Sequence, residues 1–265
     1  MIDPASPVLL FDSGVGGLTV LAELRKLLPD MPVIYAADSA GLPYGTKTEA
    51  EIAARVSGLL GVLSERYRPR LATIACNTAS TIALGMVREV LRIPIVGTVP
   101  AIKPAAEMTK TGVIGLLGTA ATIRQRYVDN LESEFAAGKR LIRFPAPGLV
   151  EAAEAKLRGH PVDYNEIGHA VAGLRGQPGG EDIDTVVLAC THFPLLNDEL
   201  QEVLGPDVKL IDGAAGIARR IATLVEGQPM ARQAPDLAVF TSEPDSRPSF
   251  AKVLSHYGLE RVERL

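Results

Sequence analysis

Short apolar runs alternate with longer segments of helical periodicity along most of the chain. The runs are rich in β-branched residues and end at small polar residues or glycine, which is typical of buried strands that lead into helices. Between them, apolar residues recur every three or four positions, as in the leucines from Leu18 to Leu28. This alternation predicts parallel sheets with right-handed crossovers, and therefore an α/β fold.

The same pattern sets the expected elements. Strands are expected at 8–11, 33–36, 71–75, 93–96, 113–117, 141–144, 185–189, 208–211 and 237–241. Helices are expected at 18–28, 48–67, 78–91, 121–135, 149–157, 164–174, 196–204, 216–225 and 248–257. A proline-containing connection after the fourth strand separates two similar series of elements.

Two of the apolar runs look like copies of each other. The run Leu71–Ala75 leads into Cys76, the run Thr185–Ala189 leads into Cys190, and each is the third expected strand of its series. We therefore expect two similar lobes with mainly parallel sheets, related by a pseudo-two-fold, with the active site in the cleft between them. The first lobe is expected to take residues 1–98 plus 212–265, and the second residues 99–211.

Composition narrows the class of protein. The chain has 265 residues, 47% of them hydrophobic, and a net charge of −4 from 27 basic and 31 acidic residues mixed along its length. No basic stripe favours nucleic acid as a partner. We see no signal sequence and no apolar run long enough for a membrane span, so the expected compartment is the cytoplasm. The sequence does not fix the oligomeric state, and a homodimer is the assembly that we keep open.

The chain contains two cysteines, Cys76 and Cys190. A single cysteine after an apolar run is more often a small core residue than a reactive one. Two cysteines in the same local context favour chemistry instead. Inverting a stereocentre requires a proton to leave one face and another to arrive on the opposite face, which two acid/base groups accomplish directly. A thiol, whose ordinary pKa is about 8.5 and falls at a helix N-terminus, forms a workable acid/base couple with its thiolate near neutral pH.

Further candidates follow the expected strands. The turn that begins Asp12-Ser13-Gly14 narrowly misses a dinucleotide-binding glycine pattern and is suited to binding a carboxylate. Asp12 is close enough in the predicted sheet to support Cys76, and His192 is two residues after Cys190. Amide, hydroxyl and carboxylate side chains that suit a small zwitterion complete the set: Ser13, Asn77, Thr78, Thr119, Thr122, Glu151 and Thr191. Each could instead serve as a helix cap or a first-turn charge. No spacing of His, Cys and carboxylates predicts a metal site.

Several of these stretches, taken in order, resemble the aspartate/glutamate racemase family, and within it the enzymes that act on glutamate. The resemblance rests on 8–20, Pro43-Tyr44-Gly45, 75–79, Leu149-Val150-Glu151 and 189–196, and extends to the Phe240-Thr241-Ser242 stretch. The set is highly specific, although any one stretch would be modest evidence. One departure, Arg143–Pro147, where many relatives carry Cys-Pro, affects no candidate catalytic residue.

The resemblance implies an isomerase that interconverts L- and D-glutamate without a cofactor and supplies D-glutamate for peptidoglycan. It implies Cys76 as the base for the D enantiomer and Cys190 as the base for the L enantiomer, with Asp12 and His192 as their supports. The substrate-binding residues that it implies are Asp12, Ser13, Tyr44, Gly45, Asn77, Thr78, Thr191 and His192.

Three alternatives remain open at this point. A racemase of the same family that acts on aspartate or another amino acid is the nearest rival. A thiol hydrolase or transferase would use one cysteine with His192 and leave the other without a role. A two-lobed binding protein would leave both thiols unexplained.

Overall fold

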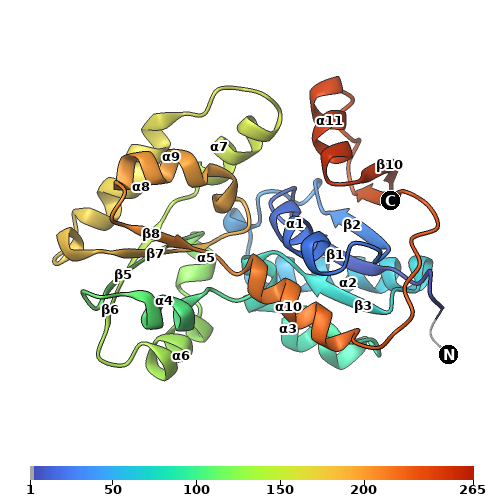
Figure 1. Ribbon diagram of the computed structural model, residues 1–265, viewed down its shortest axis with the longest axis horizontal. Helices are drawn as coiled ribbons and strands as arrows, with labels where there is room; N and C mark the ends of the chain where they lie inside the picture. Colours follow the sequence, from blue (N-terminus) through green and yellow to red (C-terminus); the bar gives the residue numbers. More distant parts are fainter. Residues whose placement is uncertain (1–2) are drawn as a thin grey trace. The chain divides into compact units, whose positions relative to one another are not determined.

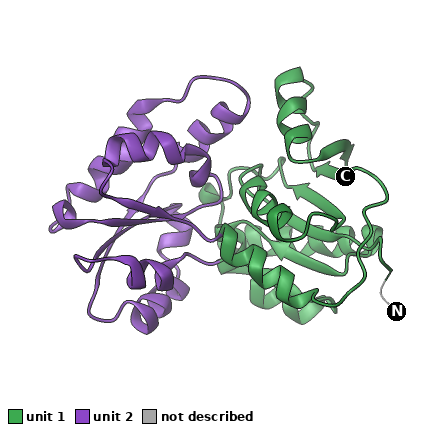
Figure 2. Cartoon of the chain, viewed as in Figure 1, with its two compact units in different colours: residues 1–98, 214–265 green, residues 99–213 purple. Residues whose placement is uncertain are grey.

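Both sheets of the protein are parallel, and their strands are buried segments joined by helices. The structure is a computed structural model that describes residues 3–265, shown in Figure 1. It divides into two compact units, coloured separately in Figure 2: unit 1 takes residues 1–98 and 214–265, and unit 2 takes residues 99–213. The α/β class with parallel sheets, predicted from the alternating pattern, is confirmed.

The sheet of unit 1 has the strand order β10-β9-β2-β1-β3-β4. Its strands are β1 (Val8–Asp12), β2 (Val33–Ala37), β3 (Leu71–Ile74), β4 (Ile95–Gly97), β9 (Asp236–Phe240) and β10 (Leu259–Arg264). β9 pairs with β2, which makes the last strands of the chain part of the first sheet. The strand order reverses at β1, because β2 lies on one side of it and β3 on the other. In open α/β sheets, ligands bind at the carboxyl ends of the strands at such a point.

Helices cover this sheet because their apolar faces match those of the strands. They are α1 (Leu18–Leu27), η1 (Tyr44–Thr46), α2 (Glu49–Tyr67), α3 (Asn77–Val90), α10 (Ala214–Leu224) and α11 (Pro248–His256). Leu9 and Phe11 of β1 join one buried cluster with apolar residues of α2 and α3. Since successive strand residues point to opposite faces, Val8 and Leu10 face the other side of the sheet. Thr48 and Glu51 form a reciprocal capping box that begins α2.

The sheet of unit 2 has the order β6-β5-β7-β8, which matches β2-β1-β3-β4 of unit 1 strand for strand. Its strands are β5 (Val113–Gly118), β6 (Arg140–Pro145), β7 (Thr185–Ala189) and β8 (Lys209–Ile211). Its helices are α4 (Ile102–Met108), α5 (Ala120–Ile123), α6 (Arg126–Phe135), α7 (Gly148–Leu157), α8 (Tyr164–Arg175), η2 (Gly180–Asp182), η3 (Phe193–Leu196) and α9 (Asn197–Leu204). The repeat inferred from the two cysteine runs therefore has a structural counterpart in the two sheets.

Three elements differ from the pattern-based expectation. α4 forms where a proline-containing connection was expected, because Pro104 lies in the first helical turn, where its missing N–H costs little. The helix expected at 121–135 is two helices, since Gln125 takes an extended backbone conformation and begins the second one. β10 was not expected, because most of its residues are charged and exposed, as an edge strand allows.

Candidate active site

The turn after β1 and the end of β3 lie side by side in unit 1. Phe11 of β1 pairs with Ile74 of β3, and the Ala75 N–H donates to the Phe11 carbonyl at 2.7 Å. Pairing therefore continues until the residue before Cys76, which brings Cys76 next to the Asp12-Ser13 turn. We call this region, with Asn77 and Thr78, the Cys76 strand end.

Asp12 fixes the shape of the turn. Its carboxylate is fully buried and accepts hydrogen bonds from the Ser13 N–H at 2.8 Å and the Gly17 N–H at 2.7 Å. The Tyr35 hydroxyl donates to the Gly14 carbonyl at 2.8 Å and closes the same turn. These bonds hold Ser13 at the edge of the sheet. Support of Cys76 by Asp12 stays a prediction, and the contacts provide a route for it through Ser13.

Two polar groups lie at hydrogen-bonding distance from the Cys76 sulfur. The Ser13 hydroxyl is 3.5 Å from Sγ, and the Ala79 N–H, in the first turn of α3, donates to Sγ at 3.5 Å. Cys76 is the N-cap of α3, so the positive end of the helix dipole also lies at the sulfur. Donors and a helix N-terminus both favour a thiolate over a thiol. The structure thus places a chemically supported sulfur at this strand end.

Asn77 and Thr78 follow Cys76 in the first turn of α3, and both are buried. The Asn77 Oδ1 has no hydrogen-bond partner, and neither does the hydroxyl of Ser80 one turn further along. A buried polar atom without a partner costs free energy, and a bound water, ion or other molecule can supply the missing bond. The unpaired amide oxygen is therefore a candidate acceptor for a donor on a substrate.

Tyr44 and Gly45 lie in η1, and Tyr44 belongs to the same buried cluster as Cys76. The Tyr44 hydroxyl donates to Asp38 at 2.6 Å, and Arg55 and Thr241 also donate to that carboxylate. Burial, together with the bond to Asp38, raises the pKa of Tyr44 far above its usual value. Tyr44 is therefore a neutral phenol in a fixed position.

The equivalent strand ends of unit 2 carry Cys190. Gly118 of β5 pairs with Ala189 of β7, so Thr119 and Cys190 follow neighbouring strands. Thr119 is the N-cap of α5: the Thr122 N–H donates to its hydroxyl at 3.2 Å, and the two hydroxyl oxygens are 3.0 Å apart. Both threonines are buried, as is Thr191. We call this region the Cys190 strand end.

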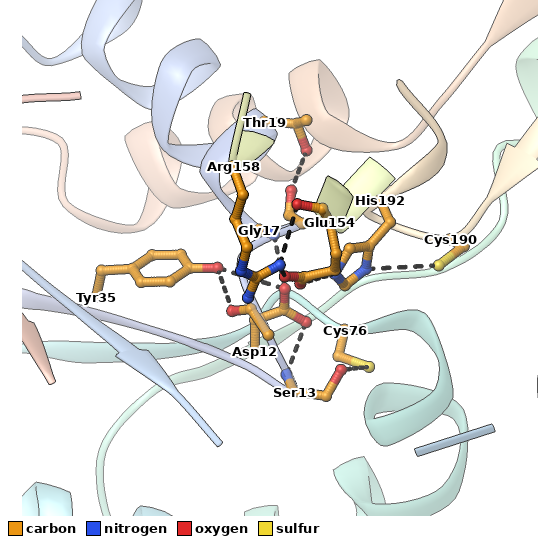
Figure 3. Close-up of polar contacts among 12 residues, drawn as sticks. Asp12, Ser13, Gly17, Thr19, Tyr35, Cys76, Glu154, Arg158, Cys190 and His192 are labelled. Carbon is orange, nitrogen blue, oxygen red and sulfur yellow. Dashed lines mark hydrogen bonds and ion pairs between the residues drawn. The ribbon is translucent and has the colours of Figure 1, made fainter. Parts of the chain in front are cut away.

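His192 links Cys190 to a glutamate. Its Nδ1 is 3.9 Å from the Cys190 sulfur, and its Nε2 is 2.8 Å from Oε1 of Glu154 in α7 (Figure 3). Arg158 donates to the other oxygen of Glu154. Burial alone would lower the pKa of His192, but the bonds to Cys190 and Glu154 raise it well above its usual range. A protonated imidazole can donate a hydrogen bond to a sulfur at this distance.

Glu154 was not among the residues predicted from sequence, whereas Glu151 was. Glu151 lies in the first turn of α7 and its side chain is exposed, so its predicted contact with substrate stays a prediction. Glu154 lies three residues later on the same side of the helix and is buried. The available signal was the helical spacing, which places a second carboxylate one turn after the first.

Within residues 3–265, no group of three or more His, Cys, Asp and Glu side chains is arranged to hold a metal ion. Over the same residues, every helix is too short or too polar to cross a membrane. The two strand ends provide a pair of sulfurs, each within hydrogen-bonding distance of at least one polar group.

Comparison with known proteins decides the family. The model of the Asp/Glu/hydantoin racemase family matches residues 18–221 of the chain. This protein belongs to the Asp/Glu/hydantoin racemase family. The resemblance drawn from the motifs is thereby confirmed, and a member of this racemase family is an isomerase.

Individual members of the racemase family cover almost the whole chain. A glutamate racemase from Sphingopyxis alaskensis is 63% identical over 98% of this chain and 97% of its own length. One from Salmonella typhimurium is 44% identical over 99% of this chain and 93% of its own. The crystal structure of Escherichia coli glutamate racemase with L-glutamate and the activator UDP-MurNAc-ala has a TM-score of 0.91, 42% identity and 98% coverage of both chains.

Proposed function

We propose that the protein interconverts L- and D-glutamate by transferring protons between Cα and two thiols, without a cofactor. The observation that carries the proposal is the repeat itself. The same strand of two matching sheets is followed within two residues by a buried cysteine, Cys76 in one unit and Cys190 in the other. The similarity to glutamate racemases of 63% and 44% identity supports glutamate over aspartate as the substrate.

In the direction from L to D, the Cys190 thiolate takes the proton from Cα. The Cys76 thiol then donates a proton to the opposite face of the carbanion, which leaves Cys190 as a thiol and Cys76 as a thiolate. The reverse direction starts from that state, with Cys76 as the base. Before another L enantiomer reacts, the two sulfurs return to their first protonation states by exchange with water. No atom of the enzyme is consumed, and no redox step is required.

Groups at the strand ends suit the remaining parts of glutamate. The unpaired Asn77 Oδ1 can accept a hydrogen bond from the ammonium group, and the hydroxyls of Ser13, Thr119 and Thr191 can donate to carboxylates. We further propose that the D-glutamate formed is used for peptidoglycan. A strain depleted of this protein would then need D-glutamate in its medium to grow.

The decisive experiment starts from one enantiomer in deuterated water, with no cofactor added. Proton NMR at early times should find deuterium at Cα of the product and hydrogen at Cα of the recovered substrate, because different thiols serve the two faces. Equal deuterium in both pools from the first turnovers would contradict the two-thiol mechanism. L-aspartate in place of L-glutamate tests the rival substrate in the same assay.

Substitution of each cysteine provides the matched comparison. Cys76→Ser and Cys190→Ser should each abolish inversion in both directions, since either direction uses both sulfurs, and each variant retains one thiol as an internal control. A thiol hydrolase would instead lose activity in only one of the two variants. Circular dichroism of glutamate solutions follows the inversion directly.

A further inference from the structure

Four side chains of unit 2 form a line that ends at the buried sulfur of Cys190. Arg158 donates to Glu154, the Glu154 Oε1 is 2.8 Å from the His192 Nε2, and the His192 Nδ1 is 3.9 Å from the Cys190 Sγ (Figure 3). Glu154 is 7% exposed and His192 is 2% exposed. The line joins the middle of α7 to the loop after β7, two elements that pack together through η3.

The contact with Glu154 decides how the imidazole presents itself to the sulfur. A carboxylate accepts hydrogen bonds and does not donate them, so the His192 Nε2 carries the proton at that contact. The other ring nitrogen, Nδ1, therefore faces Cys190. It is an acceptor in the neutral ring and a donor in the protonated ring, so the charge on His192 decides whether the sulfur meets a base or an acid.

The charge of Glu154 favours the protonated ring. A carboxylate within hydrogen-bond distance stabilises an imidazolium, and burial strengthens the effect because water screens the pair less. Burial alone would raise the pKa of Glu154, but the bonds to His192 and Arg158 lower it to about 2, so it remains ionised across the working range.

Other charges around His192 do not perform this task. Cys190 faces it from its own loop, Glu154 from α7, and Arg158 lies beyond Glu154 at the end of α7. Glu199 of α9 is also buried, but it pairs with Lys156. Among the described residues, the helices α7 and α9 that pack against η3 carry the buried carboxylates Glu154 and Glu199. Of these two, Glu154 is the one bonded to the ring.

We propose that Glu154 is a positioning residue that holds His192 protonated, with Nδ1 facing Cys190, and thereby sets the pH range in which Cys190 serves as the base. The kinetic part of this inference rests on the proposed function, whereas the expected effect on the His192 ring does not. Glu154 is buried and acts on the sulfur through the imidazole.

The first test observes the ring without any substrate. Ring signals of labelled histidine, followed by NMR against pH, should show that Glu154→Gln lowers the titration of His192 by roughly one unit or more, as loss of an adjacent opposite charge does. Glu199→Gln removes a buried carboxylate of the same unit and should leave that titration unchanged. An unchanged His192 titration in E154Q overturns the proposal.

The second test uses the two directions of the reaction. In a racemase the equilibrium constant is one, so kcat/KM must be equal in both directions, and we expect E154Q to lower both by roughly tenfold to a hundredfold at neutral pH. The deuterium isotope effect separates the two thiols. With Cα-deuterated substrates, E154Q should raise the isotope effect from L-glutamate and lower that from D-glutamate, because proton transfer at Cys190 becomes the slower step.

These readouts distinguish the possible failures. General destabilisation would lower the amount of active enzyme without changing the pH profile or the ratio of isotope effects. If wild-type enzyme does not racemise glutamate but E154Q still shifts the His192 titration, the proposed function fails and the positioning role stands. If E154Q does not fold, Arg158→Met replaces it. That change removes a competitor for Glu154, so His192 should titrate at the same or a higher pH, and a lower value overturns the proposal.

Discussion

Asp38, which follows β2, holds together three segments of unit 1. It accepts hydrogen bonds from Tyr44 at 2.6 Å, from Thr241 at 2.6 Å, and from Arg55, whose Nη2 is 2.7 Å away and whose Nε also donates. Its side chain is fully buried. We predict that Asp38→Asn lowers the free energy of unfolding substantially, because asparagine keeps the shape of the side chain but cannot accept all of these bonds.

The size of the effect follows from exposure. A hydrogen bond to a charged group contributes about 1.5–3 kcal/mol, and removing one partner of a fully buried pair costs about 3–5 kcal/mol. The Arg55 side chain is 36% exposed, so water recovers part of its lost interaction and the pair must be discounted. We expect a loss of about 2–4 kcal/mol. For a domain of this size each kcal/mol lowers Tm by roughly 2–4 °C.

The loss should depend on pH in a defined direction. Burial alone would raise the pKa of Asp38, but the bonds from Arg55, Thr241 and Tyr44 lower it below its usual value. A carboxyl with a lowered pKa stabilises the fold above its unfolded pKa of about 3.9, and the stabilisation disappears as the pH falls through the folded value. The difference between wild type and D38N should therefore be largest near neutral pH and shrink in acid.

Urea unfolding followed by circular dichroism, at neutral pH and again below the unfolded pKa of about 3.9, measures both the size of the loss and its pH dependence. Asp245→Asn is the matched control, because the Arg247 partner of Asp245 is exposed and an ion pair with an exposed partner contributes little to stability. The reasoning is refuted if D38N costs no more than D245N at neutral pH. It is also refuted if the difference between wild type and D38N stays constant as the pH falls.

Two further changes test the packing of unit 2. Gly180→Ala should lower the free energy of unfolding by about 1–3 kcal/mol, since a Cβ there would lie 2.5–2.7 Å from backbone atoms of Leu174 and Arg175. The control is Gly168→Ala in α8, where a Cβ meets no atom within 4 Å and the change should be neutral or stabilising. Equal effects of the two substitutions in urea unfolding would contradict the prediction. Asp184→Asn should lower the free energy of unfolding by about 1–2 kcal/mol near neutral pH. The Asp184 carboxylate accepts hydrogen bonds from the N–H groups of Lys110 and Thr111 and from the Thr109 hydroxyl. Burial alone would raise the pKa of Asp184, but these bonds lower it to about 2. That loss should be present above about pH 4 and fade toward pH 2, and thermal unfolding across that range checks it.

Much of the fold could be predicted because buried parallel strands leave a plain signal. β3 and β7 lie in mainly apolar runs that stop at Ala-Cys. Parallel strands that are covered on both faces typically have such near-continuous apolar sequences. β10 leaves no such signal. It is an edge strand whose residues are mostly charged, and it belongs to the sheet only because its backbone pairs with β9. Backbone pairing of that kind is decided by tertiary structure, which periodicity does not report.

The residues of the candidate site also divide into those that the sequence could predict and those that it could not. The sequence could place Cys76 and Cys190 at strand ends, because a strand end is a local feature. It could not identify Glu154 as the partner of His192, since that contact depends on how α7 packs beside η3, far away in the sequence. Spacing along α7 put Glu151 and Glu154 on one side of the helix, but only the packing determines which of them is buried.

The two strand ends also show why a repeat predicts positions better than partners. β1 and β5 occupy the same place in matching sheets, yet the residues after them differ in what they contact. Ser13, after β1, lies 3.5 Å from the Cys76 sulfur, whereas Thr119, after β5, bonds to Thr122 and begins α5. Cys190 is followed two residues later by His192, whose ring contacts the sulfur and is bonded to Glu154 of α7. A neutral hydroxyl and a helix N-terminus thus serve one sulfur, and an ion-paired imidazole serves the other. Only the second arrangement contains an imidazole whose charge depends on its ion pair with Glu154, so we expect changes at Glu154 to alter the pH dependence of the proposed reaction through the Cys190 side.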